Sequence, residues 1–526
     1  MALCYSSRLS FRFQKYRSFL FRSAILRPFS TTTLDKRLKT IDDLPGHPNY
    51  FGFGMALQIL LAKIITKKPL GKIILELQFV DVEKFGPIHK VELPGIKLVN
   101  LVDPIEVAKV LRNDPKYPRR ADFPVLNYYR ELSKTIPGIF FANGEDWYRY
   151  RSVVSQRILR PREVSEYVPV LNDITTDFVT RLHAIRMPAG GDAEQEVKDI
   201  DNELFKWSFE SVSHVLFDKR FGCLGDEVNP DAQDFIKSVG GFLAAIIEVG
   251  FTPVWFYKMY ETKRFKEFVF HFDNMYKYAE LFISQKVQEL ESEKKLDAAK
   301  DPEKVGFVEF LLSNEKLSRD DLIASIIDLL FAGVDTTSNT MQWFLYMMAK
   351  NQDKQEKLFQ EVTMVLEPDE LPSAKTLAKM PYLKACLKET LRLFPVLSAT
   401  SRLIQTDMEI LGYHIPKGTQ VQFLNYYMGR NESNFKEANE FIPERWLRTG
   451  KREVADSDQA FASIPFGFGT RMCVGRRVAE LELYLLATRL IQKYKIKYPD
   501  NEIVEPFMRG ITIPDRPLRV KFTERA

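Results

Sequence analysis

The stretch Phe466-Gly-Phe-Gly-Thr-Arg-Met-Cys-Val-Gly475 places one cysteine, Cys473, in a glycine-rich turn directly before a periodic helical segment. Glycine reaches backbone angles closed to other residues and lets the chain pass close to a flat, bulky group. A cysteine at a helix N-terminus faces the positive end of the helix dipole, which favours the metal-binding thiolate. A single cysteine is one of the axial ligands of haem iron. A bare Cys-x-Gly would equally suit a buried apolar cysteine in a loop.

Five of the ten positions follow the pattern Phe-x-x-Gly-x-Arg-x-Cys-x-Gly, which resembles the cysteine loop of the cytochrome P-450 family. The resemblance implies that Cys473 is the axial thiolate ligand of haem b. Phe466 is then expected to shield the sulfur from water, Arg471 to pair with a haem propionate, and Gly467 and Gly475 to shape the turn. The implied fold is mainly α with a small β-sheet region, in one large domain that buries the haem.

The net charge of +5 is unevenly spread along the 526 residues. Residues 1–34 carry six Arg and Lys and no Asp or Glu, which leaves 69 basic against 70 acidic residues, or about −1, in the rest of the chain. We therefore expect no nucleic-acid binding. An Arg- and Ser-rich, acid-free N-terminus predicts a mitochondrial transit peptide over 1–34, cleaved between about 29 and 37, before a domain over 35–526. A disordered basic tail would have the same composition.

The pattern of residues 51–80 is apolar and helical but broken by lysines, so this segment can lie on a membrane without crossing it. Strands are expected at 87–93 and 96–101, and an irregular loop at 117–144. The apolar, aromatic stretch 241–257 suits a core helix and its turn. In members of the family it resembles, this region covers the substrate entrance and dips into the membrane surface.

The longest predicted helix runs from about 318 to 350 and contains Ala332-Gly-Val-Asp-Thr-Thr337. Glycine and threonine in mid-helix lower helix propensity, and a buried aspartate is costly unless paired or functional. The segment resembles the family's oxygen-activating helix. By that resemblance, Ala332 and Gly333 leave room for O2, while Asp335 and Thr336 relay protons to bound oxygen. Members that isomerise peroxides commonly depart from this pattern.

Three further residues match the family's propionate-binding positions. Trp147 and Arg151 lie four residues apart, on one face of a predicted helix. Arg402 has the place in the chain of another propionate-binding arginine. Trp147 and Arg151 could instead form an exposed cation–π pair.

Glu389, Arg392 and Arg445 match the family's Glu-x-x-Arg and Pro-Glu-Arg motifs. The resemblance implies a buried, architectural ion triad. An arginine on each side would satisfy both carboxylate oxygens, the condition under which buried charge is tolerable.

The leader and the segment Gly475-Arg-Arg-Val-Ala-Glu480 look like the family's mitochondrial branch. That branch receives electrons from a ferredoxin of the adrenodoxin kind, itself reduced by an NADPH-dependent ferredoxin reductase. A basic surface speeds encounter with such an acidic partner. Lys384 and Lys388, with Arg476 and Arg477, match the branch's ferredoxin patch, although a solvated basic face would have the same composition.

These features predict a haem-thiolate monooxygenase that uses O2 to hydroxylate an apolar small molecule, with a sterol, steroid or secosteroid favoured. The expected location is the matrix side of the mitochondrial inner membrane, in peripheral contact with it. A xenobiotic or fatty-acid monooxygenase of the same fold remains open. A peroxide isomerase of the same fold and a haem carrier or sensor are less favoured, because the intact Ala-Gly-x-Asp-Thr segment argues against both.

Overall fold

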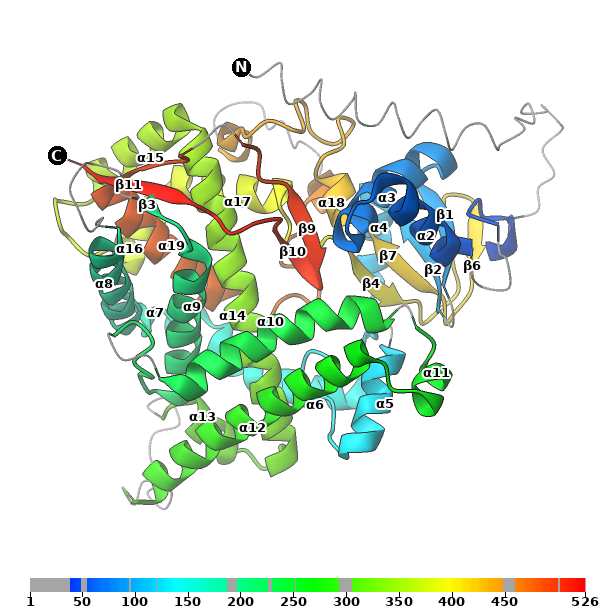
Figure 1. Ribbon diagram of the computed structural model, residues 1–526, viewed down its shortest axis with the longest axis horizontal. Coiled ribbons are helices and arrows are strands. Elements are labelled where there is room, and N and C mark those ends of the chain that lie inside the picture. The colour runs from blue at the N-terminus through cyan, green and yellow to red at the C-terminus, as the bar shows by residue number, and fades with distance from the viewer. Residues whose placement is uncertain are drawn as a thin grey trace.

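The computed structural model describes residues 38–48, 54–93, 96–120, 122–186, 196–225, 229–250, 252–292, 305–447, 459–499 and 502–525. Most of these residues are helical, and the strands form small sheets (Figure 1). The predicted class, mainly α with a small β region, is therefore confirmed. The predicted leader lies outside the described residues. Within the described ranges no helix combines the length and the apolar content needed to cross a bilayer.

The apolar stretch near the N-terminus forms two helices, α2 (Gly54–Thr66) and α3 (Leu70–Phe85). The chain turns between them at Lys67, whose φ is 54°, and at Pro69, which precedes the first turn of α3. Proline is well tolerated at a helix start, where no backbone N–H is needed. The apolar segment over 51–80 therefore forms two helices, where the sequence pattern indicated one helical stretch.

A four-stranded sheet packs beside these helices in the order β1 (Ile88–Leu93), β2 (Ile96–Leu101), β7 (Gln420–Phe423), β4 (Thr400–Leu403). β1 and β2 form the antiparallel hairpin expected from the sequence, and β2 pairs with β7 in parallel. A separate apolar cluster that includes Val99, Leu101, Val421 and Phe423 fills one side of this sheet. The sheet therefore joins the early part of the chain to its last third.

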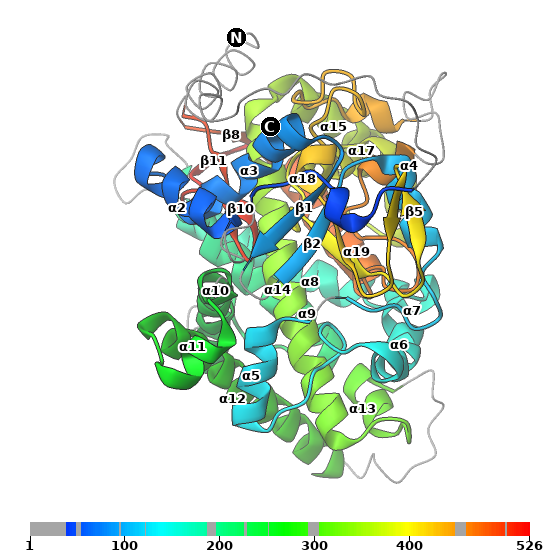
Figure 2. The ribbon, with the colours of Figure 1, turned by 90° about the vertical axis from the view of Figure 1, so that its right-hand side faces the viewer.

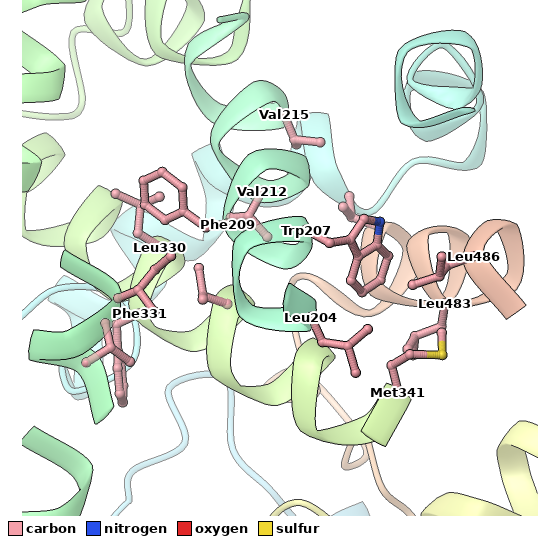
Figure 3. Packing of buried hydrophobic residues seen from close by; sticks show 14 of the residues in the cluster. Leu204, Trp207, Phe209, Val212, Val215, Leu330, Phe331, Met341, Leu483 and Leu486 are labelled. Atoms are coloured by element: carbon pink, nitrogen blue, oxygen red, sulfur yellow. The ribbon is translucent and has the colours of Figure 1, made fainter. Parts of the chain in front are cut away.

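The longest helix among the described residues, α14 (Arg319–Lys350), runs through the centre of the molecule (Figures 1 and 2). It begins where predicted, because Ser318 and Asp321 form a capping box. α9 (Ile200–Phe217), α10 (Pro230–Gly250), α12 (Lys263–Ser292) and α19 (Arg476–Lys493) pack around it. In Figure 3, Trp207 of α9 and Met341 of α14 lie near Leu483 of α19 in one continuous core.

The prediction of an irregular loop over 117–144 is wrong in part, because α5 (Pro124–Ser133) lies within it. Pro124 occupies the first helical turn, where its fixed φ favours a helix. Val125, Leu126 and Tyr129 then share one buried face. Pro124 therefore marks the start of a helix, and the irregular chain lies before and after it.

The remaining elements cover the core and close its edges. The helices among them are α4 (Pro104–Arg112), α6 (Gly144–Ile158), α7 (Pro161–Ser165), α8 (Val168–Ile185), α11 (Val254–Met259), α13 (Phe307–Leu312), α15 (Gln352–Val365), α16 (Ala374–Ala378), α17 (Pro381–Leu393), α18 (Asn425–Met428), and the 3-10 helices η2 (Ile41–Asp43), η4 (Pro443–Trp446) and η5 (Gln459–Ala462). A three-stranded sheet contains β3 (Glu196–Val197), β11 (Val520–Glu524) and β8 (Tyr494–Lys497), and two hairpins pair β5 (Met408–Ile410) with β6 (Tyr413–Ile415) and β9 (Pro506–Arg509) with β10 (Ile511–Pro514).

Candidate active site

The cysteine loop is a compact turn before α19. The Cys473 amide donates to the Phe466 carbonyl over 2.8 Å, which closes the loop. Gly467 and Gly469 have φ of 71° and 74°, a region that disfavours residues with a side chain. Gly475 stands at the N-cap of α19. The glycines therefore present Cys473 at the start of the helix, as the sequence pattern indicates.

Cys473 lines a cavity with about 1340 Å³ of space that protein atoms do not fill, a volume that includes space open to solvent. Its side chain is accessible from this cavity although protein surrounds it. Burial raises the pKa of the Cys473 thiol, while the Gly475 amide and the charges of Arg151, Arg120 and Arg476 act to lower it. The helix N-terminus thus does not by itself make the sulfur a thiolate, and a bound metal cation would be needed to deprotonate it fully.

Predicted residues from three parts of the chain meet in this cavity. Its walls are largely apolar, and the predicted site residues among them are Trp147, Arg151, Ala332, Thr336, Phe466, Arg471, Cys473 and Gly475. Gly467, Asp335 and Arg402 lie outside its lining. The cavity is thus bounded by the cysteine loop on one side and by α14 on another.

Arginines gather at one side of the cavity. Burial, with like charge nearby, lowers the pKa of Arg120 to about 10 and that of Arg471 to about 8, and burial lowers the pKa of Arg151 to about 10. Arg471 donates to the carbonyls of Pro118 and Ala142 and stacks 4.4 Å above the ring of Trp147. This cluster of buried cations favours an anionic group.

Arg402 pairs instead with a carboxylate, because its Nε donates to Asp114 over 2.8 Å. The positive charges of Arg402 and Arg471 act to lower the pKa of Asp114, against the larger raising effect of burial.

Arg120 belongs to the arginine group at the cavity but has no motif of its own, so sequence reasoning missed it. Three cavity-lining arginines and a cavity-facing cysteine fit haem b, which carries two propionates and an axial position for a thiolate.

The Ala332–Thr337 segment divides its residues between two faces of α14. Thr336 lines the cavity, and its hydroxyl donates to the Ala332 carbonyl over 2.6 Å. Gly333 also lines it, but a Cβ added there would lie 2.9 Å from a methyl group of Val212 in α9. The glycine therefore permits the close approach of two helices as well as leaving space in the cavity.

Asp335 is buried on another face of α14. Arg509 Nη2 lies 3.9 Å from its Oδ1, and Asn339 Nδ2 lies 3.4 Å from its Oδ2. Burial raises the pKa of Asp335 to about 6, and Arg509 acts to lower it. Asp335 therefore titrates near neutral pH, within one residue of the cavity-lining Thr336.

Two carboxyl groups in the cavity lining were not predicted. Asp328 accepts the Phe140 amide over 2.8 Å, and burial raises its pKa to about 7. Neither carboxylate oxygen of Glu482 has a hydrogen-bond partner among the described residues, and burial raises its pKa well above the ordinary value. In the sequence each of them is a single acidic residue in a helical segment. Acidic residues on a protein surface occur in the same pattern, so the sequence does not single these two out.

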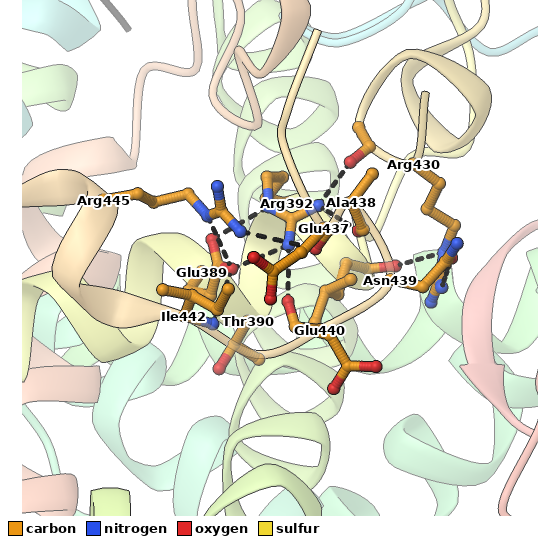
Figure 4. Close-up of polar contacts among 12 residues, drawn as sticks. Glu389, Thr390, Arg392, Arg430, Glu437, Ala438, Asn439, Glu440, Ile442 and Arg445 are labelled. Carbon is orange, nitrogen blue, oxygen red and sulfur yellow. Dashed lines mark hydrogen bonds and ion pairs between the residues drawn. The ribbon is translucent and has the colours of Figure 1, made fainter. Parts of the chain in front are cut away.

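The predicted triad residues are brought together at the end of α17 (Figure 4). Arg392 donates to both oxygens of Glu389 over 2.8 and 2.7 Å, and Arg445 donates to Oε1 over 3.0 Å. The indole of Trp446 and the amide of Ile442 donate to the same carboxylate. Both arginines and the glutamate are buried, so this network ties α17 to η4 in the interior.

The four predicted docking residues stand on two helices. Lys388 and Arg477 are exposed, and Lys384 and Arg476 are partly buried. Lys388 lies 6.0 Å from the centre of the Trp446 ring, and Arg476 pairs with Glu480 over 2.9 Å. Arg476 also stacks 5.6 Å above Phe466 of the cysteine loop. At least part of this basic surface therefore adjoins the Cys473 turn.

Comparison with known proteins gives a consistent result. A family model described as cytochrome P450 matches residues 48–522. The mitochondrial sterol 26-hydroxylase of Mus musculus is 35% identical over 93% of this chain and 90% of its own length. Cytochrome P450 10 of Lymnaea stagnalis is 35% identical over 84% of this chain and 79% of its own. The mitochondrial 1,25-dihydroxyvitamin D(3) 24-hydroxylase of Rattus norvegicus is 32% identical over 95% and 92%.

The family match spans most of the chain, including the cysteine loop, the cavity that this loop faces and the central helix above it. The motifs of the sequence and the largely apolar cavity at Cys473 agree with this match. The chain belongs to the cytochrome P450 family of haem-thiolate monooxygenases.

Proposed function

We propose that this enzyme hydroxylates a sterol, steroid or secosteroid with O2 and electrons from a ferredoxin of the adrenodoxin kind, which an NADPH-dependent ferredoxin reductase reduces. The substrate class is supported by relatives whose names specify a sterol and a vitamin D derivative, each similar over nine tenths of its length. The observation that carries the catalytic assignment is the accessible sulfur of Cys473 at a largely apolar cavity.

Haem b bound in the cavity would be held by the sulfur of Cys473. It would supply the activation of O2 and the insertion of one oxygen atom into a substrate C–H bond, while two electrons from the ferredoxin and two protons convert the other oxygen atom to water. Arg120, Arg151 and Arg471 hold the propionates through charge-assisted hydrogen bonds. Trp147 supports Arg471 by stacking on its guanidinium. These residues would therefore hold the cofactor in place.

The remaining site residues control water and protons. Phe466 limits the access of water to the sulfur, which preserves its electron donation. Ala332 and Gly333 keep the α14 side of the cavity free of bulky side chains. Burial raises the pKa of Asp335 to about 6, which suits a group that binds and releases a proton during turnover, and the Thr336 hydroxyl lies next to it in sequence at the cavity.

The ferredoxin is proposed to dock on Lys384, Lys388, Arg476 and Arg477. A basic surface next to the Cys473 turn brings an acidic electron donor close to the cofactor's thiolate side. Docking of this kind weakens with ionic strength, because salt screens charges beyond a distance of about 8–10 Å.

The enzyme is proposed to act on the matrix side of the mitochondrial inner membrane as a peripheral protein, with residues 1–34 as its transit peptide. α2 and α11 lie toward the same side of the molecule in both views (Figures 1 and 2). Both expose large apolar side chains next to lysines, among them Ile64 and Leu60 of α2 and Trp255 and Met259 of α11. Such surfaces bind an interface without spanning it.

The reduced protein under carbon monoxide tests the cofactor assignment. Thiolate ligation is expected to give the far red-shifted Soret band, and its absence would refute the assignment. Titration of the oxidised protein with sterols, secosteroids, fatty acids and xenobiotics then identifies the substrate class from the spectral shift. Turnover with ferredoxin, reductase and NADPH must yield hydroxylated product from the ligand that binds. A shift confined to fatty acids or xenobiotics would overturn the substrate proposal while leaving the cofactor proposal intact.

A further inference from the structure

A second cavity lies between α9, α14, the β9–β10 hairpin and the start of α3. It holds about 970 Å³ of space that protein atoms do not fill, and it is markedly more polar than the cavity at Cys473. The polar side chains in its walls are Lys72, Asp201, Asn339, Gln342, Arg509, Asp515 and Arg516. A cavity of this size and polarity has room for water.

Unsatisfied buried atoms cluster where this cavity meets α14. Asp335 Oδ1, Gln342 Nε2 and Arg509 Nε have no hydrogen-bond partner among the described residues. Nearly all buried polar groups in proteins have one. Asn339 and Arg509 both line the cavity and lie within 3.9 Å of the Asp335 carboxylate. They therefore connect Asp335, which lies outside the lining of the Cys473 cavity, to this polar space.

Arg509 is the cation shared by two carboxyl groups, the buried Asp335 and the partly buried Asp201. It acts to lower the pKa of both Asp335 and Asp201. Burial outweighs it at each site and raises the pKa of Asp201 to about 7 and the pKa of Asp335 to about 6. The Asp201 carboxylate accepts the Leu518 amide, and Asp199 adds negative charge nearby. One guanidinium thus acts electrostatically on two carboxyl groups, and burial raises the pKa of both.

The remaining charges around the cavity are paired with one another. Lys72 of α3 bonds to Glu505 and Asp515 over 2.7 Å each. Arg516 bonds to Asp515 and also to Glu502. These charges therefore form an ion-pair network, while Asp201 and Asp335 are the carboxyl groups near Arg509 whose pKa values are raised.

We propose that this cavity is the route by which protons from solvent reach Asp335, with Asp201 as the proton-loading group and Arg509 as a positioning residue between them. The inference rests on the proposed role of Asp335 as proton donor. In each transfer an O–H bond of water or of one carboxyl group breaks, and an O–H bond to the next acceptor forms. No electron moves. Asp335, having released its proton toward Thr336, regains one from the cavity side.

Asp201→Asn removes the titrating group and can still accept the Leu518 amide. Asp199→Asn is the matched control, because it removes a carboxylate two residues away at the start of the same helix and asparagine caps a helix as well as aspartate does. Infrared spectra of the resting protein between pH 5 and 9 count the protonated carboxyl groups without turnover. Asp328 has a similar pKa, so two carboxyl groups contribute to the carboxylic C=O band that titrates near pH 7. We expect Asp201→Asn to lose about half of that titrating band and Asp199→Asn to keep all of it.

In the reconstituted system we expect Asp201→Asn to raise the solvent deuterium isotope effect and to divert electrons from product to hydrogen peroxide. A general acid supplies about 10²–10⁴ in rate and water can partly bypass a relay, so product per NADPH should fall about tenfold. If Asp201→Asn matches Asp199→Asn in both measurements while Asp335→Asn uncouples the enzyme, the route is refuted and the role of Asp335 stands. If Asp335→Asn also leaves coupling unchanged, the proposed proton donor itself fails.

Discussion

Replacing Arg392 with lysine tests how the buried triad stabilises the fold. The Arg392 guanidinium uses all five of its N–H donors: two on Glu389 and one each on the carbonyls of Gly429, Ala438 and Glu440. Lysine keeps the charge but has three donors, so at least two acceptors lose their partner. Hydrogen bonds to charged groups contribute about 1.5–3 kcal/mol each, which gives a loss of about 3–6 kcal/mol.

Urea unfolding followed by tryptophan fluorescence, at equal haem occupancy, measures this loss as a lower midpoint. Arg445→Lys is expected to lower the free energy of unfolding by a smaller amount. Arg445 makes one hydrogen bond to Glu389, and Arg392 makes two shorter ones to the same carboxylate. Arg264→Lys, at an exposed ion pair on α12, serves as the surface control and should barely move the midpoint. If Arg392→Lys unfolds like the Arg264 control, the argument from donor number is wrong.

The remaining predictions concern the cofactor, the partner, the membrane and pH. Cys473→Ser should fold but lose the red-shifted carbon monoxide band and all monooxygenase turnover; full activity would contradict the ligand assignment. Lys388→Glu should weaken ferredoxin binding by about tenfold at low salt, measured by titration, whereas Lys316→Glu, at an exposed position just before α14, should not. Ile64→Glu should reduce sedimentation with anionic vesicles, since it places charge on the exposed apolar face of α2. Asp328 has a raised pKa of about 7, so it binds its proton more tightly in the folded protein than in the unfolded chain. The protein should therefore lose stability relative to Asp328→Asn as the pH rises from 5 to 8. A difference between their urea midpoints that does not change with pH would refute this.

Local motifs made much of the site predictable from the sequence. The glycine spacing around Cys473 and the Ser318 cap depend on residues adjacent in sequence, and both are found as expected. The meeting of Glu389, Arg392 and Arg445 rested on the family resemblance, because Arg445 lies 56 residues from the glutamate it contacts. No pattern within the chain itself indicates that contact.

The features that could not be predicted depend on tertiary packing. Arg120 follows a proline-rich segment and becomes a site residue only because the chain folds it beside Arg471. Asp335 and Thr336 are neighbours in sequence, yet a helix turns successive side chains by about 100°, so Thr336 lines the Cys473 cavity while Asp335 lies outside it beside Arg509. Glu482 and Asp328 look like ordinary helix charges until burial is known.

The contact between Gly333 and Val212 makes two distant positions interdependent. Val212 is β-branched and its side chain has little freedom to move aside. Gly333→Ala alone should therefore push α14 away from α9 and move Thr336 with it. The Cys473 cavity would then change shape although the new methyl group contacts α9. A second change, Val212→Ala, would restore the original spacing, so a natural variant that loses the glycine should be found together with a smaller residue on the facing helix.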